Sequence, residues 1–191
     1  MQTTDETWFY AMTALIDTED EEQVARFFGD VMAAELPSLA GRAPFVASLG
    51  EVLARWRITT PAARGAAAVA SRRCRPRRCG GRPGAAGAGI RCALATNQHP
   101  ERATYVRENL GYDEVFDGLF YSCELGVAKP DPAYFTEAVR RLGTEPGRTL
   151  LIDDNIDNVA AAKEAGLVAD LFASDGGRGE LDRILGEYVL R

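Results

Sequence analysis

The chain of 191 residues is short of several residue types, and each shortage excludes a class of protein. It has one histidine, His99, and four cysteines, of which only Cys74 and Cys79 stand close together, as a single C-x4-C. A structural zinc site usually takes two close pairs of such ligands, and this chain has no second pair. A disulfide-rich secreted domain needs a regular cysteine framework, which is also missing. The sequence therefore predicts no zinc site and reduced thiols in a reducing, cytoplasmic compartment.

Long apolar runs are absent as well. The longest one near the start, residues 8–16, is interrupted by Thr13 and is too short to span a bilayer. Asp5 and Glu6 stand where a signal peptide carries positive charge, so we expect neither export nor a membrane span. The net charge of −6 and the 46% of hydrophobic residues are typical of a soluble domain, and that charge argues against nucleic-acid binding.

Acidic residues are missing from one long stretch. None occurs between Glu51 and Glu101, although the chain has 28, and residues 52–100 carry ten arginines. Residues 61–89 are Arg, Ala, Gly or Pro at all but four positions. They therefore offer no large apolar side chain whose burial could offset the entropy of ordering. We interpret this segment as disordered, or as GC-rich DNA read out of frame. A basic arm that binds nucleic acid is the alternative, and the lack of aromatic residues among the arginines argues against it.

Residues 1–60, by contrast, have clear helical periodicity. Apolar side chains recur there every three or four positions, and Pro37 and Gly41 mark breaks. The pattern predicts three packed helices, a small helical domain without a recognisable site. The apolar faces are Trp8, Met12 and Leu15 or Ile16; Val24, Phe27, Phe28 and Val31; and Leu49, Val52, Leu53 and Trp56.

Strands and helices alternate in residues 90–191. Helix-opening residues are followed, about ten positions later, by glycines that end helices. The alternation predicts an α/β, Rossmann-like parallel sheet with helices on its faces. The predicted strands are 90–95, 119–122, 149–152 and 167–172, and the predicted helices are 100–110, 133–142 and one that begins at Asn155 or Asp157 and ends at Ala165.

Polar residues follow these strands, at the edge of a parallel sheet where ligands bind. Thr96 and Asn97 offer a hydroxyl and backbone N–H groups that can cradle an anion, and Lys129, in a loop stiffened by prolines, can neutralise a phosphate. Asp153 and Asp154 end a buried strand, and such adjacent carboxylates suit Mg2+. Taken singly, they are a helix cap, a surface lysine and a polar turn. Their order along one α/β array indicates a site for a phosphoryl group and its metal.

Three segments of the chain, LATN, GVAKPDPAYF and LLIDDNIDNVAAAKEAGL, resemble motifs II, III and IV of the haloacid dehalogenase-like (HAD) hydrolase superfamily. The resemblance covers residues 88–172, and residues 1–60 resemble more loosely the small helical cap that one subfamily inserts after its first motif. It implies that Thr96 binds a phosphoryl oxygen with the backbone of Asn97, and that Lys129 holds the phosphate and the nucleophile. Asp154, with Asp153, would position Mg2+. The family attacks its substrate through an aspartate, and water then hydrolyses the covalent intermediate.

The acid pair also separates two activities within the superfamily. Members that dehalogenate resemble the phosphatases but usually replace the pair with a small residue and an asparagine. Asp153 and Asp154 therefore favour a Mg2+-dependent phosphatase that acts on a small phosphorylated metabolite. The sequence indicates neither which metabolite nor the oligomeric state.

The first motif of the family, a strand that ends in Asp-x-Asp and carries the nucleophile, has no counterpart in the pattern. The nearest candidate, residues 16–20, follows a helical stretch and is better interpreted as a helix end leading into an acidic N-cap. Residues 6–16 resemble the first cap helix, so the chain is expected to begin after that motif and to lack the central first strand. A remnant that binds metal or phosphate without turnover is therefore the second hypothesis. The third, a nucleic-acid-binding basic arm, would show steeply salt-dependent binding.

Overall fold

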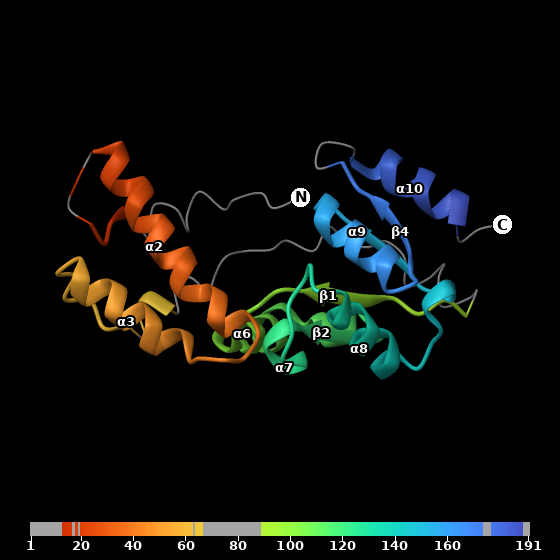
Figure 1. Cartoon of the computed structure of the whole chain (residues 1–191), viewed down its shortest axis with the longest axis horizontal. Coiled ribbons are helices and arrows are strands. Elements are labelled where there is room, and N and C mark those ends of the chain that lie inside the picture. Colours follow the sequence, from red (N-terminus) through yellow and green to blue (C-terminus); the bar gives the residue numbers. More distant parts are fainter. Residues whose placement is uncertain are drawn as a thin grey trace. The chain divides into compact units, whose positions relative to one another are not determined.

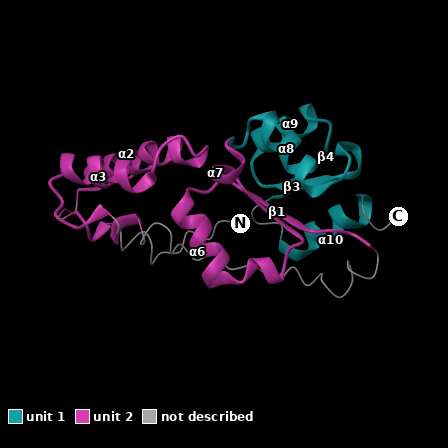
Figure 2. Ribbon diagram, turned by 90° about the horizontal axis from the view of Figure 1, so that it is seen from below, with its two compact units in different colours: residues 1–2, 127–191 teal, residues 3–126 magenta. Residues whose placement is uncertain are grey.

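The computed structural model describes residues 13–16, 18, 20–62, 64–66, 89–173 and 177–188. These residues fall into two compact units, residues 3–126 and residues 127–191 with the first two residues, which Figure 2 colours separately. Each unit is described by itself. The division falls inside the segment 90–191 that the sequence predicts as one α/β core, and the predicted boundaries at residues 60 and 89 stay predictions.

The unit 3–126 begins with helix α2 (Glu21–Leu39). Asp20 is its N-cap: the side-chain Oδ1 accepts hydrogen bonds from the backbone N–H groups of Glu22, at 2.9 Å, and Gln23, at 3.4 Å. Hydrogen bonds from the side chain and backbone of Gln23, and from the backbone of Glu22, lower the pKa of Asp20. The predicted acidic N-cap is therefore confirmed at Asp20, whereas Asp17 and Glu19 lie outside the described residues.

Helix α3 (Phe45–Arg55) packs beside α2, as Figure 1 shows. The predicted apolar faces meet in a core that includes Phe27, Val31, Phe45, Leu49, Val52 and Leu53. Trp56 closes the pair: its ring meets the Phe27 ring edge-on, with centroids 5.4 Å apart, and its Nε1 donates to Asp30 Oδ2 at 2.8 Å. Of the first predicted helix only residues 13–16 are described, and Ile16 is buried in the same core.

A glycine is required at the turn between the two helices. Gly41 has φ +66°, a left-handed conformation that residues with a Cβ avoid. A Cβ on Gly41 would also lie 2.8 Å from the carbonyl oxygen of Cys123. The turn therefore contacts the α/β part of the same unit at a spacing that leaves no room for a side chain.

Part of the arginine-rich segment 61–89 is described. Residues 62 and 64–66 are helical, and Ala66 is buried against the α2–α3 core. Gly65 lies so close to Leu49 that an added Cβ would be 3.2 Å from Leu49 Cδ2. Ala63 and residues 67–88 lie outside the described residues, so the hypotheses of disorder, a misread frame and a nucleic-acid-binding arm stay untested.

Strand β1 (Ala93–Thr96) pairs in parallel with β2 (Gly118–Tyr121), and Thr96 stands opposite Tyr121. The crossover between the two strands is α6 (Pro100–Leu110) followed by the 3-10 turn η2 (Tyr112–Glu114), and Gly111 between them has φ +61°. The helix agrees with the prediction. The predicted second strand extended one residue too far, because Ser122 begins a short helix, α7 (Ser122–Leu125), that the sequence did not predict.

The unit 127–191 repeats the same architecture. Strand β3 (Leu150–Asp153) pairs in parallel with β4 (Val168–Leu171), and α9 (Ile156–Glu164) is the crossover. Helix α8 (Pro132–Leu142), capped by Asp131 as predicted, precedes the 3-10 turn η3 (Pro146–Arg148). Helix α10 (Gly177–Tyr188) was not predicted.

Both described sheets are parallel strand pairs joined by helices, so the predicted α/β class is confirmed. Each pair ends, at the carboxyl edge of its first strand, in polar residues that the sequence singled out. Within the part of the chain that the structure describes, no helix has the length and apolar character needed to cross a membrane.

Candidate active site

The end of β3 holds a buried ion pair. Lys129, from the loop before α8, places its Nζ 2.5 Å from Oδ2 of Asp153, the last residue of β3. Only 9% of the Lys129 side chain and 8% of the Asp153 side chain are exposed. The alternative interpretation of Lys129 as a solvated surface lysine is therefore wrong.

The second carboxylate oxygen of Asp153 is also engaged. Oδ1 accepts hydrogen bonds from Asn158 Nδ2, at 2.9 Å, and from the backbone N–H of Asn155, at 3.0 Å. Burial acts to raise the pKa of Asp153, but the charge and hydrogen bond of Lys129, with those from Asn158 and Asn155, outweigh it, so the pKa is lowered. Asp153 is thus a fixed anion that holds the Lys129 ammonium in one position.

Asp154 has a different environment. It follows β3 directly and is exposed, and the next residue, Asn155, caps α9 by accepting the backbone N–H of Asp157 at 2.8 Å. Asp154 thus lies between the end of β3 and the N-cap of α9.

The carboxylates of Asp153 and Asp154 fit a Mg2+ site with few protein ligands. Mg2+ commonly takes one or two carboxylates and completes its shell with water and substrate phosphate oxygens. Asp154, with Asp153 beside it, could provide those carboxylates. A cage built from protein alone is not available, since the described residues contain no cluster of three or more His, Cys, Asp or Glu side chains that could hold a metal.

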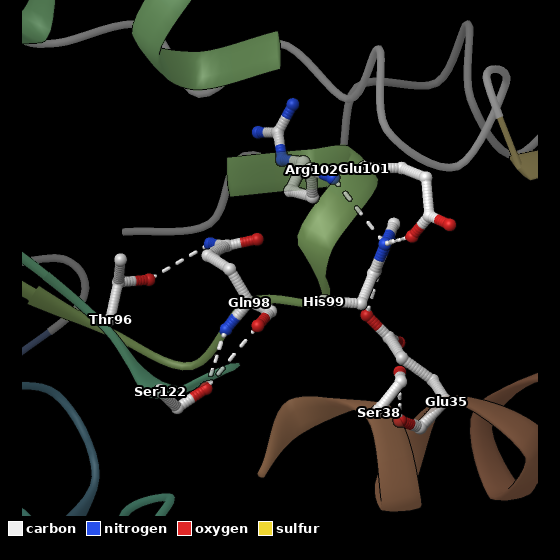
Figure 3. Close-up of polar contacts among 8 residues, drawn as sticks. All are labelled: Glu35, Ser38, Thr96, Gln98, His99, Glu101, Arg102 and Ser122. Carbon is white, nitrogen blue, oxygen red and sulfur yellow. Dashed lines mark hydrogen bonds and ion pairs between the residues drawn. The ribbon is translucent and has the colours of Figure 1, made fainter. Parts of the chain in front are cut away.

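The end of β1 is built from neutral groups. Oγ1 of Thr96 accepts a hydrogen bond from Gln98 Nε2 at 2.8 Å (Figure 3). The backbone N–H of Gln98 donates to Ser122 Oγ at 3.0 Å, and Ser122 Oγ lies 3.4 Å from the Gln98 carbonyl oxygen, to which it donates. Because Gln98 donates to the Thr96 oxygen, the hydroxyl hydrogen of Thr96 is left to be donated elsewhere.

The N-cap of α6 is His99, which lies three residues after Thr96. The Nδ1 atom of His99 is 3.4 Å from the backbone nitrogen of Arg102. The alternative interpretation of Thr96 and Asn97 as that cap is therefore wrong. Both residues are half-buried in the link between β1 and the helix.

The structure therefore joins some of the predicted residues directly. Lys129 and Asp153 touch, and Asp154 is adjacent, all within the unit 127–191. Thr96 and Asn97 belong to the unit 3–126. Sequence reasoning missed the residues that fix these groups, which are Gln98, Ser122 and Asn158. Only Asn158 had a sequence signal, because it lies in the first turn of the helix that the acid pair opens.

Comparison with known proteins shows which family this chain resembles. Residues 85–166, which include Thr96, Lys129 and the acid pair, match the haloacid dehalogenase-like hydrolase family. An enzyme of this family from Bacteroides thetaiotaomicron superposes with a TM-score of 0.69 at 16% identity, covering 93% of this chain and 90% of that one. The same enzyme in complex with magnesium and inorganic phosphate gives a TM-score of 0.68 at 15% identity, with the same coverage.

Two phosphatases are similar in sequence over shorter segments. A glyceraldehyde 3-phosphate phosphatase of Methanopyrus kandleri is 40% identical over 60 residues, 31% of this chain and 26% of that protein. A sesquiterpene phosphatase of Aspergillus oryzae is 30% identical over 82 residues, 43% of this chain and 42% of that protein. The matches thus span less than half the length of either relative.

The resemblance predicted from the three motifs is confirmed over residues 85–166, which match this family, and the chain shares the α/β fold of the solved structure from Bacteroides thetaiotaomicron. The ion pair at β3 and the hydroxyl network at β1 lie within the matched range.

Proposed function

We propose that this protein is a Mg2+-dependent phosphatase of a small phosphorylated molecule. The observation that carries the proposal is the buried Lys129–Asp153 pair beside the exposed Asp154 carboxylate. One strand end thereby supplies a fixed cation for a phosphate and an anion for a metal. The phosphatase activities named for the two partial relatives support the same chemistry.

Each residue has a distinct proposed role. Lys129, held by Asp153, neutralises phosphate charge as a compact point charge. Thr96 donates its hydroxyl hydrogen to a phosphoryl oxygen, and Asn97 assists through its backbone. Asp154 is the proposed ligand of Mg2+, which when bound polarises the phosphoryl group as a Lewis acid. Asp153, whose two oxygens are already engaged, is proposed chiefly to position Lys129. No nucleophile is assigned.

Hydrolysis of a generic aryl phosphate with and without Mg2+ tests this proposal. Asp154→Asn should lower kcat/KM by about 100-fold or more, since it removes the proposed metal charge from the site. Asp157→Asn, a change of the same kind at an exposed carboxylate three residues on, should leave activity within about twofold of the unmodified chain. Equal activity in all three proteins would assign the hydrolysis to a contaminant and reject the proposal.

Lys129→Ala provides a second arm of the same experiment. Activity should fall by at least about 100-fold, whereas Lys163→Ala, at an exposed lysine of α9, should have little effect. Because Lys129 also stabilises the fold, circular dichroism must first show that the variant is folded. If Lys129→Ala does not fold, Asp154→Asn alone decides the test.

A second candidate function is binding without turnover. It needs only the Lys129–Asp153 pair and the exposed Asp154 carboxylate, which suffice to hold a phosphate and its metal. Isothermal titration with Mg2+ and inorganic phosphate distinguishes the two candidates. Binding that Asp154→Asn removes, in a chain without phosphatase activity, would support the non-catalytic protein. Turnover that depends on Asp154 would exclude it.

A further inference from the structure

The single histidine of the chain is buried where three helices of the unit 3–126 meet. His99 begins α6, and only 1% of its side chain is exposed. The imidazole lies against the Phe45 ring of α3, with ring centroids 4.2 Å apart and planes inclined by 35°. Nothing in the proposed hydrolysis requires a titratable group at this place.

Each nitrogen of the ring faces a carboxylate. Nδ1 is 3.0 Å from Glu101 Oε2, in the first turn of α6, and Nε2 is 3.7 Å from Glu35 Oε1, on α2 (Figure 3). The Glu101 side chain is 31% exposed and the Glu35 side chain only 15%. The carboxylate from α2 is thus shielded from water by the same packing that buries the ring.

Two further side chains near the ring are Arg102 and Phe45. Arg102, the next residue of α6, directs its guanidinium over the Tyr105 ring, 5.7 Å from its centroid, and away from the imidazole in Figure 3. Phe45 from α3 carries no charge. Two carboxylates are thus directed at the imidazole, Glu35 from α2 and Glu101 from α6.

The contacts of Nδ1 are mutually exclusive. The backbone N–H of Arg102, at 3.4 Å, needs the lone pair of Nδ1 as its acceptor, whereas the Glu101 carboxylate needs an N–H there. A neutral imidazole has one N–H, so either tautomer turns a lone pair toward one of the two carboxylates. The imidazolium has two, so only this form donates a hydrogen bond to Glu101 through Nδ1 while its Nε2–H faces Glu35 at the 3.7 Å of an ion pair.

Opposing effects act on the charged form. Burial disfavours it, whereas two nearby carboxylates and the face of the Phe45 ring favour it. We infer that His99 is a proton-operated tie between α2 and the start of α6. Protonated, it bridges Glu35 and Glu101. Deprotonated, its Nδ1 accepts the Arg102 N–H as a helix cap, and the link to the two carboxylates is lost.

The sign of the pH dependence follows from this assignment. A group that gains carboxylate partners on folding takes up its proton more readily than in the unfolded chain, where a histidine titrates near ~6.5. The stability it contributes is fully present below that pH and is lost as the pH rises through the higher midpoint of the folded protein. Alkaline conditions should therefore loosen α2 from α6 while leaving the unit 127–191 unaffected.

Nuclear magnetic resonance tests the inference directly, because a chain with one histidine gives one imidazole Cε1–H resonance. Its titration midpoint should lie above ~6.5, and Glu35→Gln and Glu101→Gln should each lower it by about one unit. Glu108→Gln, at an exposed glutamate of α6, is the matched control and should leave it in place. A midpoint at or below ~6.5, or one that Glu35→Gln does not move, would overturn the tie.

Hydrogen–deuterium exchange then tests whether the proton controls the helices. Protection of α2 around Glu35 should fall as the pH passes the measured midpoint, relative to His99→Gln examined at the same pH. His99→Gln keeps a hydrogen-bonding side chain but does not titrate, so its protection should show no such step. A step of equal size in both proteins would assign it to another group and reject the inference, and the glutamate variants provide the same comparison if His99→Gln does not fold.

Discussion

The two described sheets end in opposite kinds of chemistry. At the end of β1, a hydroxyl, an amide and a second hydroxyl, from Thr96, Gln98 and Ser122, satisfy one another without any charge. At the end of β3, a lysine and a carboxylate are buried against each other. Both β1 and β3 have four residues, and each pairs in parallel with the next strand of the chain through a helical crossover.

The ends of β1 and β3 therefore depend on different interactions for their stability. A neutral network loses about one hydrogen bond when a member is removed, whereas a buried charge left without its partner retains its whole desolvation penalty. The end of β3 should therefore be the more sensitive of the two, and the only one whose stability depends on acid pH. Four experiments test this difference, in order of decreasing expected effect.

Removal of the cation should have the largest effect. Lys129→Met leaves Asp153 buried without its counter-ion and should lower the free energy of unfolding by about 3–5 kcal/mol. Urea denaturation at pH 7 measures it, with Lys163→Met as the matched control, expected within about 0.5 kcal/mol of the unmodified chain. Equal losses in both variants would show that the ion pair contributes nothing special.

Removal of the negative charge should have a smaller effect that depends on pH. The pKa of Asp153 is lowered, so its stabilisation is present above the ordinary value of 3.8 and is lost as the pH falls through the folded value. Asp153→Asn removes the counter-ion of Lys129 but keeps an oxygen that accepts its hydrogen bond, so it should cost about 2 kcal/mol at pH 7. Below the folded value the two proteins should converge, because both then carry a neutral side chain. A difference that persists at low pH would contradict the assignment.

At the neutral end the expected loss is smaller and independent of pH. Ser122→Ala removes the hydroxyl that bonds the backbone of Gln98 and should cost about 1 kcal/mol. The loss should be the same at pH 7 and at pH 4, as judged by thermal unfolding at each pH. A strong pH dependence would mean that a charged group reaches this network.

Thiol reactivity gives the smallest effect and tests the same contrast. Burial, with the charge of Glu124, raises the pKa of Cys123 to about 11, so the thiol beside Ser122 stays neutral. Cys92 is exposed at the entrance of β1. Alkylation at pH 8, followed residue by residue by mass spectrometry, should modify Cys92 at least about tenfold faster than Cys123. Similar rates would show that the end of β1 is open to solvent.

Local chemistry determined what the sequence could predict. The helices 100–110 and 133–142 were predicted to within a residue, because proline, aspartate and glycine at their ends act through neighbouring backbone groups. Helix α7 has four residues and is held by the contact of Ser122 with Gln98, 24 positions away. Helix α10 begins among glycines, and its one buried residue is Ile184.

The candidate site shows the same limit. The pattern of a strand followed by polar residues located Thr96, Asp153 and Asp154. It could not show that Lys129 pairs with Asp153, since those residues are 24 positions apart and only the packed chain determines that contact. The buried His99 and its two carboxylates were likewise invisible, because Glu35 and His99 come from distant parts of the sequence.

The packing of Trp56 between α2 and α3 has a practical consequence. The chain has two tryptophans, Trp8 and Trp56, so Trp8→Phe leaves the indole that packs on Phe27 and bonds Asp30 as the sole one. Its fluorescence would then report on the α2–α3 pair alone, while the unit 127–191, which contains no tryptophan, remains dark. The protein thus carries a built-in optical probe that can time the melting of its helical pair separately from the loss of total helix followed by circular dichroism.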